Sequence, residues 1–235
     1  MKLRALMCVA AAAMVLGGCA NAPKKAFNKE GAAHIQTLAV SERTAKESYS
    51  VTIVAHPGVN FGLIGGLVAA ADMAGKSDKL TSSLNPAETQ VQKRFSQKLS
   101  DALKVGGYQT SVLTLADGVA AGKAFESVRS NLKSDAFIDV DVQAGYVAAG
   151  PSSDYLPFVR VAVLNTDTKS GSPVYQDTIT YGYTYEGAKT VHLTSDKQYR
   201  FKDMDDLLAR SALAREGLYA GLDLIASQIA SDLKR

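Results

Sequence analysis

The sequence predicts an α+β fold in which a single mixed β-sheet has helices packed on it. In the first half of the chain, short runs rich in β-branched residues alternate with longer runs whose apolar residues recur at helical spacing. In the second half, strand-like runs follow one another and are separated by turn-forming residues, and a long amphipathic segment closes the chain. We therefore expect meandering strands in the second half and a long C-terminal helix on the sheet.

The first elements expected are two strands and two helices. Residues 35–40 and 49–55 are short, rich in β-branched residues and bounded by polar or turn-forming residues, which predicts strands. Residues 61–74 are apolar and too long for a strand, so they predict a helix. A second helix is expected to begin at Pro86, which suits the first helical position, and to end at Gly106-Gly107.

The following segments predict a strand, a helix and then three strands. Residues 108–115 are the next expected strand, and residues 118–132 the next helix. Residues 136–142 alternate apolar and acidic side chains, as a half-buried strand does. Residues 156–164 and 174–185 flank a run rich in Asn, Asp, Ser and Gly, which predicts a hairpin.

Asp203 is expected to cap the long final helix. Its apolar stripe consists of Leu207, Ala214, Leu218, Leu222, Ile225, Ile229 and Leu233. We expect this stripe to face the sheet, and we expect residues 34–235 to form one domain.

The N-terminus has the composition of an export signal. Lys2 and Arg4 precede residues 5–16, an uninterrupted apolar run, and small residues follow. Twelve residues span about 18 Å as a helix, well short of the roughly 30 Å hydrocarbon core of a bilayer. We therefore expect residues 1–18 to be a cleaved signal peptide and not a permanent membrane span.

The run Leu16-Gly17-Gly18-Cys19 resembles the lipobox of bacterial lipoprotein precursors. The resemblance implies that Cys19 is acylated, so that palmitate can label it, and becomes the first residue of the mature chain. Residues 19–33 are small, polar and charged, and are expected to form the lipidated tether. By resemblance to Gram-negative sorting, Ala20 implies a lipid-anchored protein on the periplasmic face of the outer membrane.

The predicted folded part also resembles a sandwich domain. The features that carry the resemblance are a helix ending in Gly-Gly-Tyr before a strand, Ser134-Asp135-Ala136 opening another strand, and a hairpin containing Gly171. They resemble the curli-secretion and penicillin-binding-protein-activator lipoproteins and the amino-terminal domain of the Tol-Pal translocation protein. The resemblance covers roughly residues 88–185 and implies an envelope role without a catalytic motif.

Composition argues against several functions. Loss of the signal leaves 24 basic against 23 acidic residues, so no nucleic-acid partner is expected. Cys8 leaves with the signal and Cys19 carries the lipid, so the folded part has no thiol for disulfides, metal binding or nucleophilic catalysis. His34, His56 and His192 match no metal-ligand spacing. We predict no metal, no cofactor besides the covalent lipid, and no enzymatic activity.

The helix expected over residues 61–74 is a candidate contact element. Gly62 and Gly66 have the spacing that lets helix backbones approach closely. The sequence leaves three alternatives open: a buried helix of the domain, docking into a lipid surface, or packing against a partner. Phe61, Leu63 and Leu67 are the candidate contact residues.

Two further sets of side chains are candidate contacts. Tyr175, Tyr181, Tyr183 and Tyr185 alternate along one expected strand, and such a row suits either a partner or the final helix. Asp139 and Asp141 are expected on the wet face of residues 136–142.

We therefore expect a non-enzymatic accessory module that binds another envelope protein or its own copies. One alternative is a lipid or small-ligand carrier, in which residues 61–74 would cover a cavity. The other is a wall or polysaccharide hydrolase acting through Asp139 and Asp141, which lie about 6.5–7 Å apart if both point from one strand face.

Overall fold

The computed structural model describes residues 24–44, 46–120 and 122–235. The predicted signal peptide and Cys19 lie outside these ranges. As predicted, the described residues form an α+β fold with a single mixed sheet. The sheet has seven strands in the order β3-β1-β4-β5-β6-β7, with β2 paired to β4. The strands are β1 (Thr37–Glu42), β2 (Ser50–Ile53), β3 (Gln109–Thr114), β4 (Ala136–Ala148), β5 (Tyr155–Asp167), β6 (Pro173–Gly182) and β7 (Val191–Leu193).

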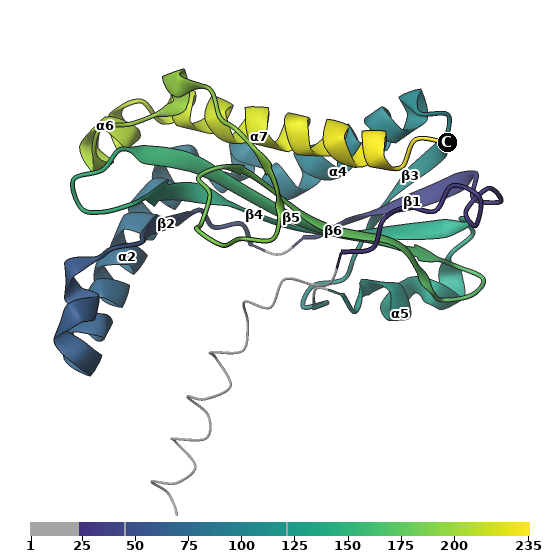
Figure 1. The fold of residues 1–235 in the computed structure, drawn as a ribbon, viewed down its shortest axis with the longest axis horizontal. Coiled ribbons are helices and arrows are strands. Elements are labelled where there is room, and N and C mark those ends of the chain that lie inside the picture. The colour runs from purple at the N-terminus through teal and green to yellow at the C-terminus, as the bar shows by residue number, and fades with distance from the viewer. Residues whose placement is uncertain (1–23, 45, 121) are drawn as a thin grey trace, which may run out of the picture.

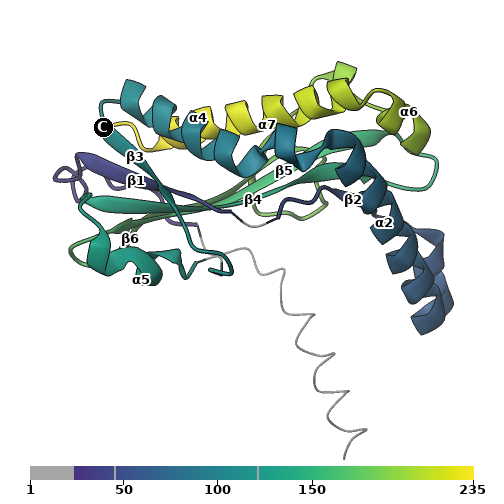
Figure 2. The same ribbon diagram turned by 180° about the vertical axis from the view of Figure 1, so that it is seen from behind.

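The helices lie mainly on one face of the sheet. They are η2 (Pro57–Phe61), α2 (Gly62–Leu84), α3 (Pro86–Thr89), α4 (Val91–Val105), α5 (Ala124–Val128), η3 (Arg129–Asn131), η4 (Lys197–Tyr199), α6 (Met204–Ala209) and α7 (Ser211–Asp232). Figure 1 and the reverse view in Figure 2 show α4 and α7 side by side on this face, whereas α5 lies on the other face. The same views show α2 pointing away from the α4–α7 layer.

The strands of the second half form the expected antiparallel meander. β4 pairs with β5 from Ala136 opposite Asp167 to Ala148 opposite Tyr155, and β5 pairs with β6. The pairs of β1 with β3 and β4, and of β2 with β4, are parallel, so the sheet is mixed.

The core lies between the sheet and the α4–α7 layer. Tyr146 donates a hydrogen bond to the carbonyl of Ala214 in α7 at 2.8 Å, so the buried phenol is satisfied. Gly221 of α7 lies directly over Tyr181, and a Cβ there would be 2.4 Å from Cδ1 of that ring. Close contact between α7 and the sheet therefore depends on a small residue at this position.

Several element boundaries differ from the prediction. α2 continues past residue 74 to Leu84, because Leu80 and Leu84 pack into the core one turn apart. The helix expected over residues 118–132 is reduced to α5 and η3. Gly118 and Gly122 have φ angles of 80° and 72°, which exclude a right-handed helix there.

Both ends of the expected domain also differ. The final helix is capped by Asp203 as predicted, since its carboxylate accepts from the amide of Asp206, but Arg210 separates α6 from α7. The domain begins before His34. Lys25 pairs with Gln176 of β6, and Ala32 is buried in the core. The second part of the expected tether therefore belongs to the folded domain.

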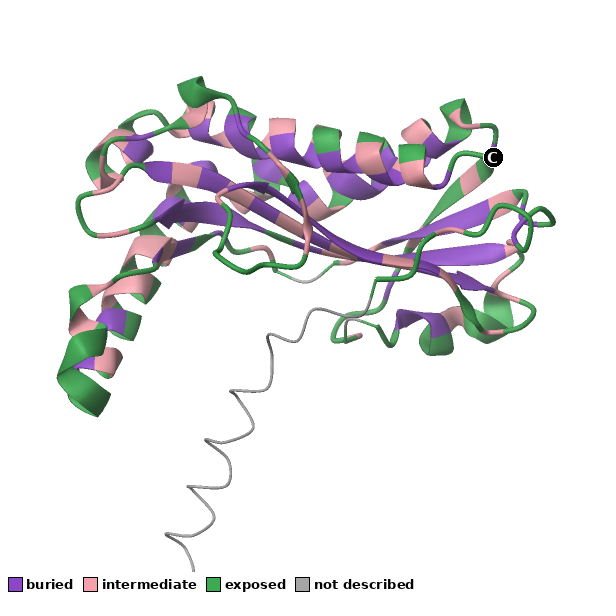
Figure 3. Cartoon of the chain, in the orientation of Figure 1, coloured by how far each residue is buried: buried purple, intermediate pink, exposed green. Residues whose placement is uncertain are grey.

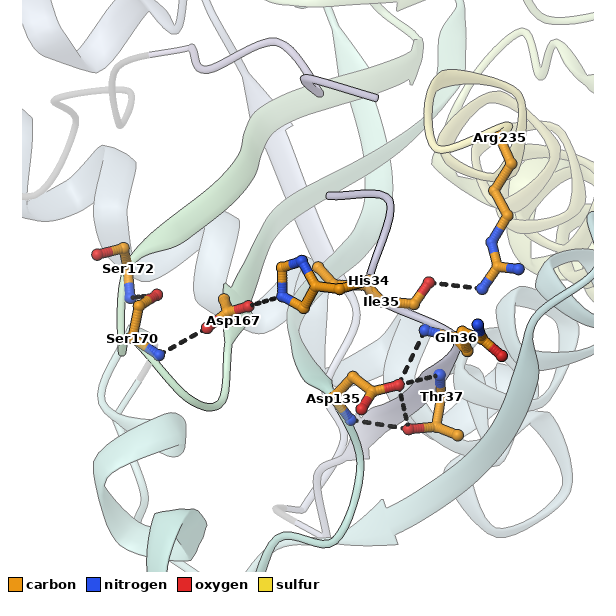
Figure 4. A network of polar contacts seen from close by, with 9 residues as sticks. All are labelled: His34, Ile35, Gln36, Thr37, Asp135, Asp167, Ser170, Ser172 and Arg235. Atoms are coloured by element: carbon orange, nitrogen blue, oxygen red, sulfur yellow. Dashed lines mark hydrogen bonds and ion pairs between the residues drawn. The ribbon is translucent and has the colours of Figure 1, made fainter. Parts of the chain in front are cut away.

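Asp135 fixes the start of β1, as Figure 4 shows. One of its carboxylate oxygens accepts from the amides of Gln36 and Thr37, both at 2.8 Å, and from the Thr37 hydroxyl. These bonds, that of the Gln36 amide first, hold the pKa of Asp135 below its ordinary value. The guanidinium of Arg235 donates to the carbonyl of Ile35, so the end of the chain is tied to the same segment.

Candidate functional site

The end of α2 that points away from the domain, together with η2, is an exposed apolar surface. We call residues 57–71 the apolar tip. Phe61, Leu63 and Leu67 are 77%, 82% and 64% exposed, and Ile64 and Val68 are exposed to a similar degree. Figure 3 shows that exposed residues dominate this end of α2. The predicted contact residues therefore lie in solvent, and the alternative of a helix wholly buried in the domain is excluded.

The apolar tip is a short hairpin of η2 and α2. The His56 side chain accepts from the amide of Gly58 at 3.0 Å and so caps η2. The backbones of Gly58 and Gly65 then touch, with Ala69 beside them. Gly62 and Gly66, which were expected to allow the close approach, face open space. The glycine of α2 that allows the close approach is therefore Gly65, which lies on a different face of the helix from the predicted pair.

The other half of α2 is bound firmly to the sheet. Side chains of α2 accept hydrogen bonds from backbone amides on the edge of β2 that does not pair with β4. Thr81 accepts from the amide of Tyr49, the residue before β2, at 2.9 Å, and Ser77 accepts from the Val51 amide at 2.8 Å. With Leu80 and Leu84 buried below, this half is a rigid base for the apolar tip.

A polar collar separates the apolar tip from this base. Asp72 accepts from Lys76 one turn further along α2, and His56 lies 3.2 Å from the same carboxylate oxygen. Lys76 first, and also His56, holds the pKa of Asp72 below its ordinary value. His56 and Asp72 are the first ionisable side chains on either side of residues 57–71.

Within the described part of the chain, the segment Pro57–Leu84 is long and apolar enough to cross a membrane by length and composition, with a mean hydropathy of 1.3 in its best window. Only 11% of that window is buried in the structure. However, Leu80 and Leu84 are part of the domain core. The fold therefore leaves the apolar tip free but not the whole segment.

The four tyrosines do not share one surface. Tyr175 and Tyr181 are 2% and 1% exposed beneath α7, and the Tyr175 hydroxyl donates to Asp232 at 2.8 Å. This placement corrects the contact-surface interpretation for these two residues. Tyr183 and Tyr185 lie beyond the end of β6, and Tyr185 is exposed.

Tyr183 and Tyr185 belong to an aromatic cluster with Phe158. The rings of Tyr183 and Tyr185 are 5.1 Å apart, and those of Phe158 and Tyr185 are 5.6 Å apart, both edge to face. Phe158 and Arg160 are half-buried on β5 and alternate with core residues. They therefore lie on the sheet face opposite α4 and α7, which we call the open face.

The open face also carries unpaired charges. The side chains of Arg160 and of the half-buried Asp141 make no hydrogen bond or ion pair with any other described residue. Phe158 and Arg160 were not predicted as contact residues from the sequence. The alternation along residues 156–164 could have revealed them, since it places both on the side opposite Val159 and Val161.

Asp139 does not lie on a wet surface, in contrast to the prediction. It is 5% exposed, pairs with Arg43 at 2.6 Å, and accepts from the amide of Gly122 at 3.0 Å. Burial raises the pKa of Asp139, although Arg43 opposes the rise. β1 and β2 pair with different parts of the same edge of β4, and the ion pair lies in the gap between them. In this gap the Gln92 side chain also donates a hydrogen bond to the Val142 carbonyl. Asp139 is therefore a structural residue, which removes the premise of the hydrolase alternative.

The apolar tip points away from the domain in Figures 1 and 2, and its large apolar side chains are exposed to solvent instead of lining an enclosed space. This removes the premise of the carrier alternative. Among residues 24–44, 46–120 and 122–235, no three His, Cys, Asp or Glu side chains are grouped so that they could hold a metal ion.

No protein-family model matches the sequence, and no curated protein matches it. Solved structures are similar over most of the chain. The PelC dodecamer from Paraburkholderia phytofirmans is 12% identical, with 92% of this chain and 98% of that chain covered and a TM-score of 0.39. The minor lipoprotein from Acinetobacter baumannii is 14% identical (85% and 93% covered, TM-score 0.34). Lipoprotein GNA1162 from Neisseria meningitidis is 11% identical (83% and 99% covered, TM-score 0.29).

Proposed function

We propose that this chain is a lipoprotein held by acylated Cys19 on the periplasmic face of the outer membrane, and that it binds another envelope protein and catalyses no reaction. The anchor is supported by the run Leu16-Gly17-Gly18-Cys19.

The observation that carries the binding role is the open face. The cluster of Phe158, Tyr183 and Tyr185 lies next to Arg160. Aromatic and arginine side chains are enriched at protein interfaces, and they supply most of the residues whose truncation weakens binding. Arg160 and Asp141 present a positive and a negative side chain to a partner, and complementary charges on the partner would fix its orientation.

The hydrogen-bonding capacity of Arg160 further favours a protein partner. A guanidinium donates up to five hydrogen bonds in one plane and pairs with carboxylates in a bidentate manner. We expect the partner to present an acidic side chain opposite Arg160, beside an apolar group that packs on the Phe158 ring.

Site-specific photo-crosslinking in living cells tests this function. A photoreactive amino acid replaces Tyr185, and for a matched control it replaces Val105, which is 91% exposed on α4 in the opposite layer. We expect one discrete protein adduct from position 185, none from position 105, and loss of the adduct when Arg160→Glu is added. Absence of the adduct from position 185, or the same adducts from both positions, contradicts the proposal.

A further inference from the structure

We propose that the apolar tip inserts into the lipid leaflet that holds the anchor, and so gives the protein a second attachment to its membrane. The proposal goes beyond binding at the open face and involves different residues.

The first argument is the absence of charge around the apolar tip. At about 100° per residue, the large side chains from Phe61 to Val68 cover roughly 160° of the helix circumference. Gly62, Gly66 and Ala70 occupy most of the remaining free surface. A helix docked in a protein groove keeps a polar outer face, as α4 does with its exposed lysines. Asn60 of η2 is the single polar side chain in residues 57–71 and does not make such a face, so these residues match lipid better than a second copy of the chain or a protein groove.

The second argument is the length of the apolar tip. The ten residues from Gly62 to Ala71 rise about 15 Å as a helix, which is half of the roughly 30 Å hydrocarbon core. The apolar tip is therefore long enough to enter one leaflet and too short to cross both. The collar of His56, Asp72 and Lys76 follows immediately, at the depth where a helix entering a leaflet meets headgroups.

The direction of the apolar tip suits the same leaflet as the anchor, a step that rests on the lipid proposed at Cys19. Figures 1 and 2 show the first described residues and the apolar tip on the same side of the domain, away from the layer of α4 and α7. Cys19 is five residues before Lys24, a separation of at most about 17 Å in an extended chain. This reach is close to the length of the apolar tip, so one leaflet can receive both.

Lysines reinforce this orientation. Lys24 lies 2.8 Å from Asp177, and Lys25 pairs with β6, so both are held where the chain leaves the domain. Lys76 lies at the collar of the apolar tip. Lys24 and Lys76 are paired with carboxylates, whereas the ammonium group of Lys25 has no acidic partner among the described residues and can attract an anionic headgroup layer.

Vesicle binding of the mature chain, residues 19–235, tests the proposal. Cys19→Ala removes the acylation site and leaves the mature chain without cysteine, so Leu67→Cys provides a single position for an environment-sensitive dye. The probe is a vesicle of phosphatidylethanolamine and phosphatidylglycerol. We expect the dye at position 67 to enter an apolar environment on mixing and to be quenched by acyl-chain quenchers, whereas a dye at Val105→Cys stays in water.

Flotation with the vesicles measures the contribution of the apolar tip. Leu63→Glu with Leu67→Glu should lower the vesicle-bound fraction by more than about tenfold, because both side chains are exposed and would enter lipid charged. Val105→Glu, the matched control, should leave binding unchanged. Thermal unfolding of each variant shows that the fold is retained.

Two results would overturn the proposal. One is a dye at position 67 that stays in water with vesicles present. The other is a blue shift that appears without vesicles and grows with protein concentration, which identifies a second copy as the occupant. The test protein has no lipid, and its open face is unaltered. If its apolar tip does not bind vesicles, the crosslinked adduct from position 185 and the acylation of Cys19 are therefore unaffected and can be judged separately.

Discussion

The backbones of Gly58 and Gly65 are in contact, so closely that a Cβ atom on Gly65 would lie 2.1 Å from the carbonyl oxygen of Gly58. This contact folds η2 against α2 and gives the apolar tip its hairpin shape. No side chain fits between the two backbones.

Gly65→Ala should therefore separate η2 from α2. We expect faster amide exchange and faster proteolysis within residues 57–61, because η2 loses its packing surface. Gly66→Ala is the matched control: it faces open space within the same turn, and removing a helical glycine should stabilise α2 by up to about 1 kcal/mol. Equal protease sensitivity of the two variants contradicts the assignment.

The pair of Asp139 and Arg43 should be needed for stability. Arg43→Met leaves a buried carboxylate without its cation and should lower the free energy of unfolding by about 3–5 kcal/mol in urea titration. Asp141→Asn removes an acid two residues along the same strand whose side chain has no partner among the described residues, and should change stability by less than about 0.5 kcal/mol. If both substitutions lowered the free energy of unfolding by several kcal/mol, the cause would be a general sensitivity of β4 to substitution and not the loss of the ion pair.

Gly221→Ala should weaken the contact between α7 and the sheet. The added methyl group would lie 2.4 Å from the Tyr181 ring, so α7 or the ring has to move. Overpacking of this kind costs about 1–3 kcal/mol, seen as a lower melting temperature. Gly75→Ala, where nothing lies within 4 Å of the new Cβ, should show no such loss.

The pH dependence of folding should include a contribution from Asp135. The folded pKa of this carboxyl lies below its unfolded value of 3.8, so its ionised form stabilises the fold above that value. The contribution is lost as pH falls through the lower folded pKa. The urea midpoint of Asp135→Asn should therefore fall less between pH 7 and pH 2 than that of the parent chain. Identical falls would mean that the bonds in Figure 4 do not depend on the charge.

Acylation of Cys19 should be detected by labelled palmitate. We expect the parent chain to incorporate the label and Cys19→Ala to lose it, because the thiol is the acceptor. Label that survives the replacement would contradict the anchor.

The sequence was sufficient to predict the α+β class, the meander of β4 to β6 and the C-terminal helix, because alternation and helical spacing persist over ten or more residues there. It did not predict β7, whose three residues from Val191 to Leu193 are too few for a pattern. Nor did it predict the shortening of the helix after Gly118, where backbone conformation decides the outcome.

The candidate site was predicted only in part. Phe61, Leu63 and Leu67 are conspicuous in sequence, but an apolar helix has the same pattern whether it is buried or free. The four tyrosines were expected on one strand face, but the strand ends at Gly182. Its φ is 88°, and a Cβ there would lie 1.8 Å from the Pro157 carbonyl oxygen. The chain leaves the sheet at this point, so Tyr181 stays in the core while Tyr183 and Tyr185 do not.

The hairpin of η2 and α2 also places a demand on delivery. On the proposed route to the outer membrane, the folded chain presents Phe61, Leu63 and Leu67 to water before it reaches a lipid surface. Exposed hydrophobic patches of this kind cause self-association and nonspecific binding to other proteins. The proposed outer-membrane anchor would therefore require a carrier between the two membranes that shields this end of the molecule as well as the acyl chains, and that releases both together.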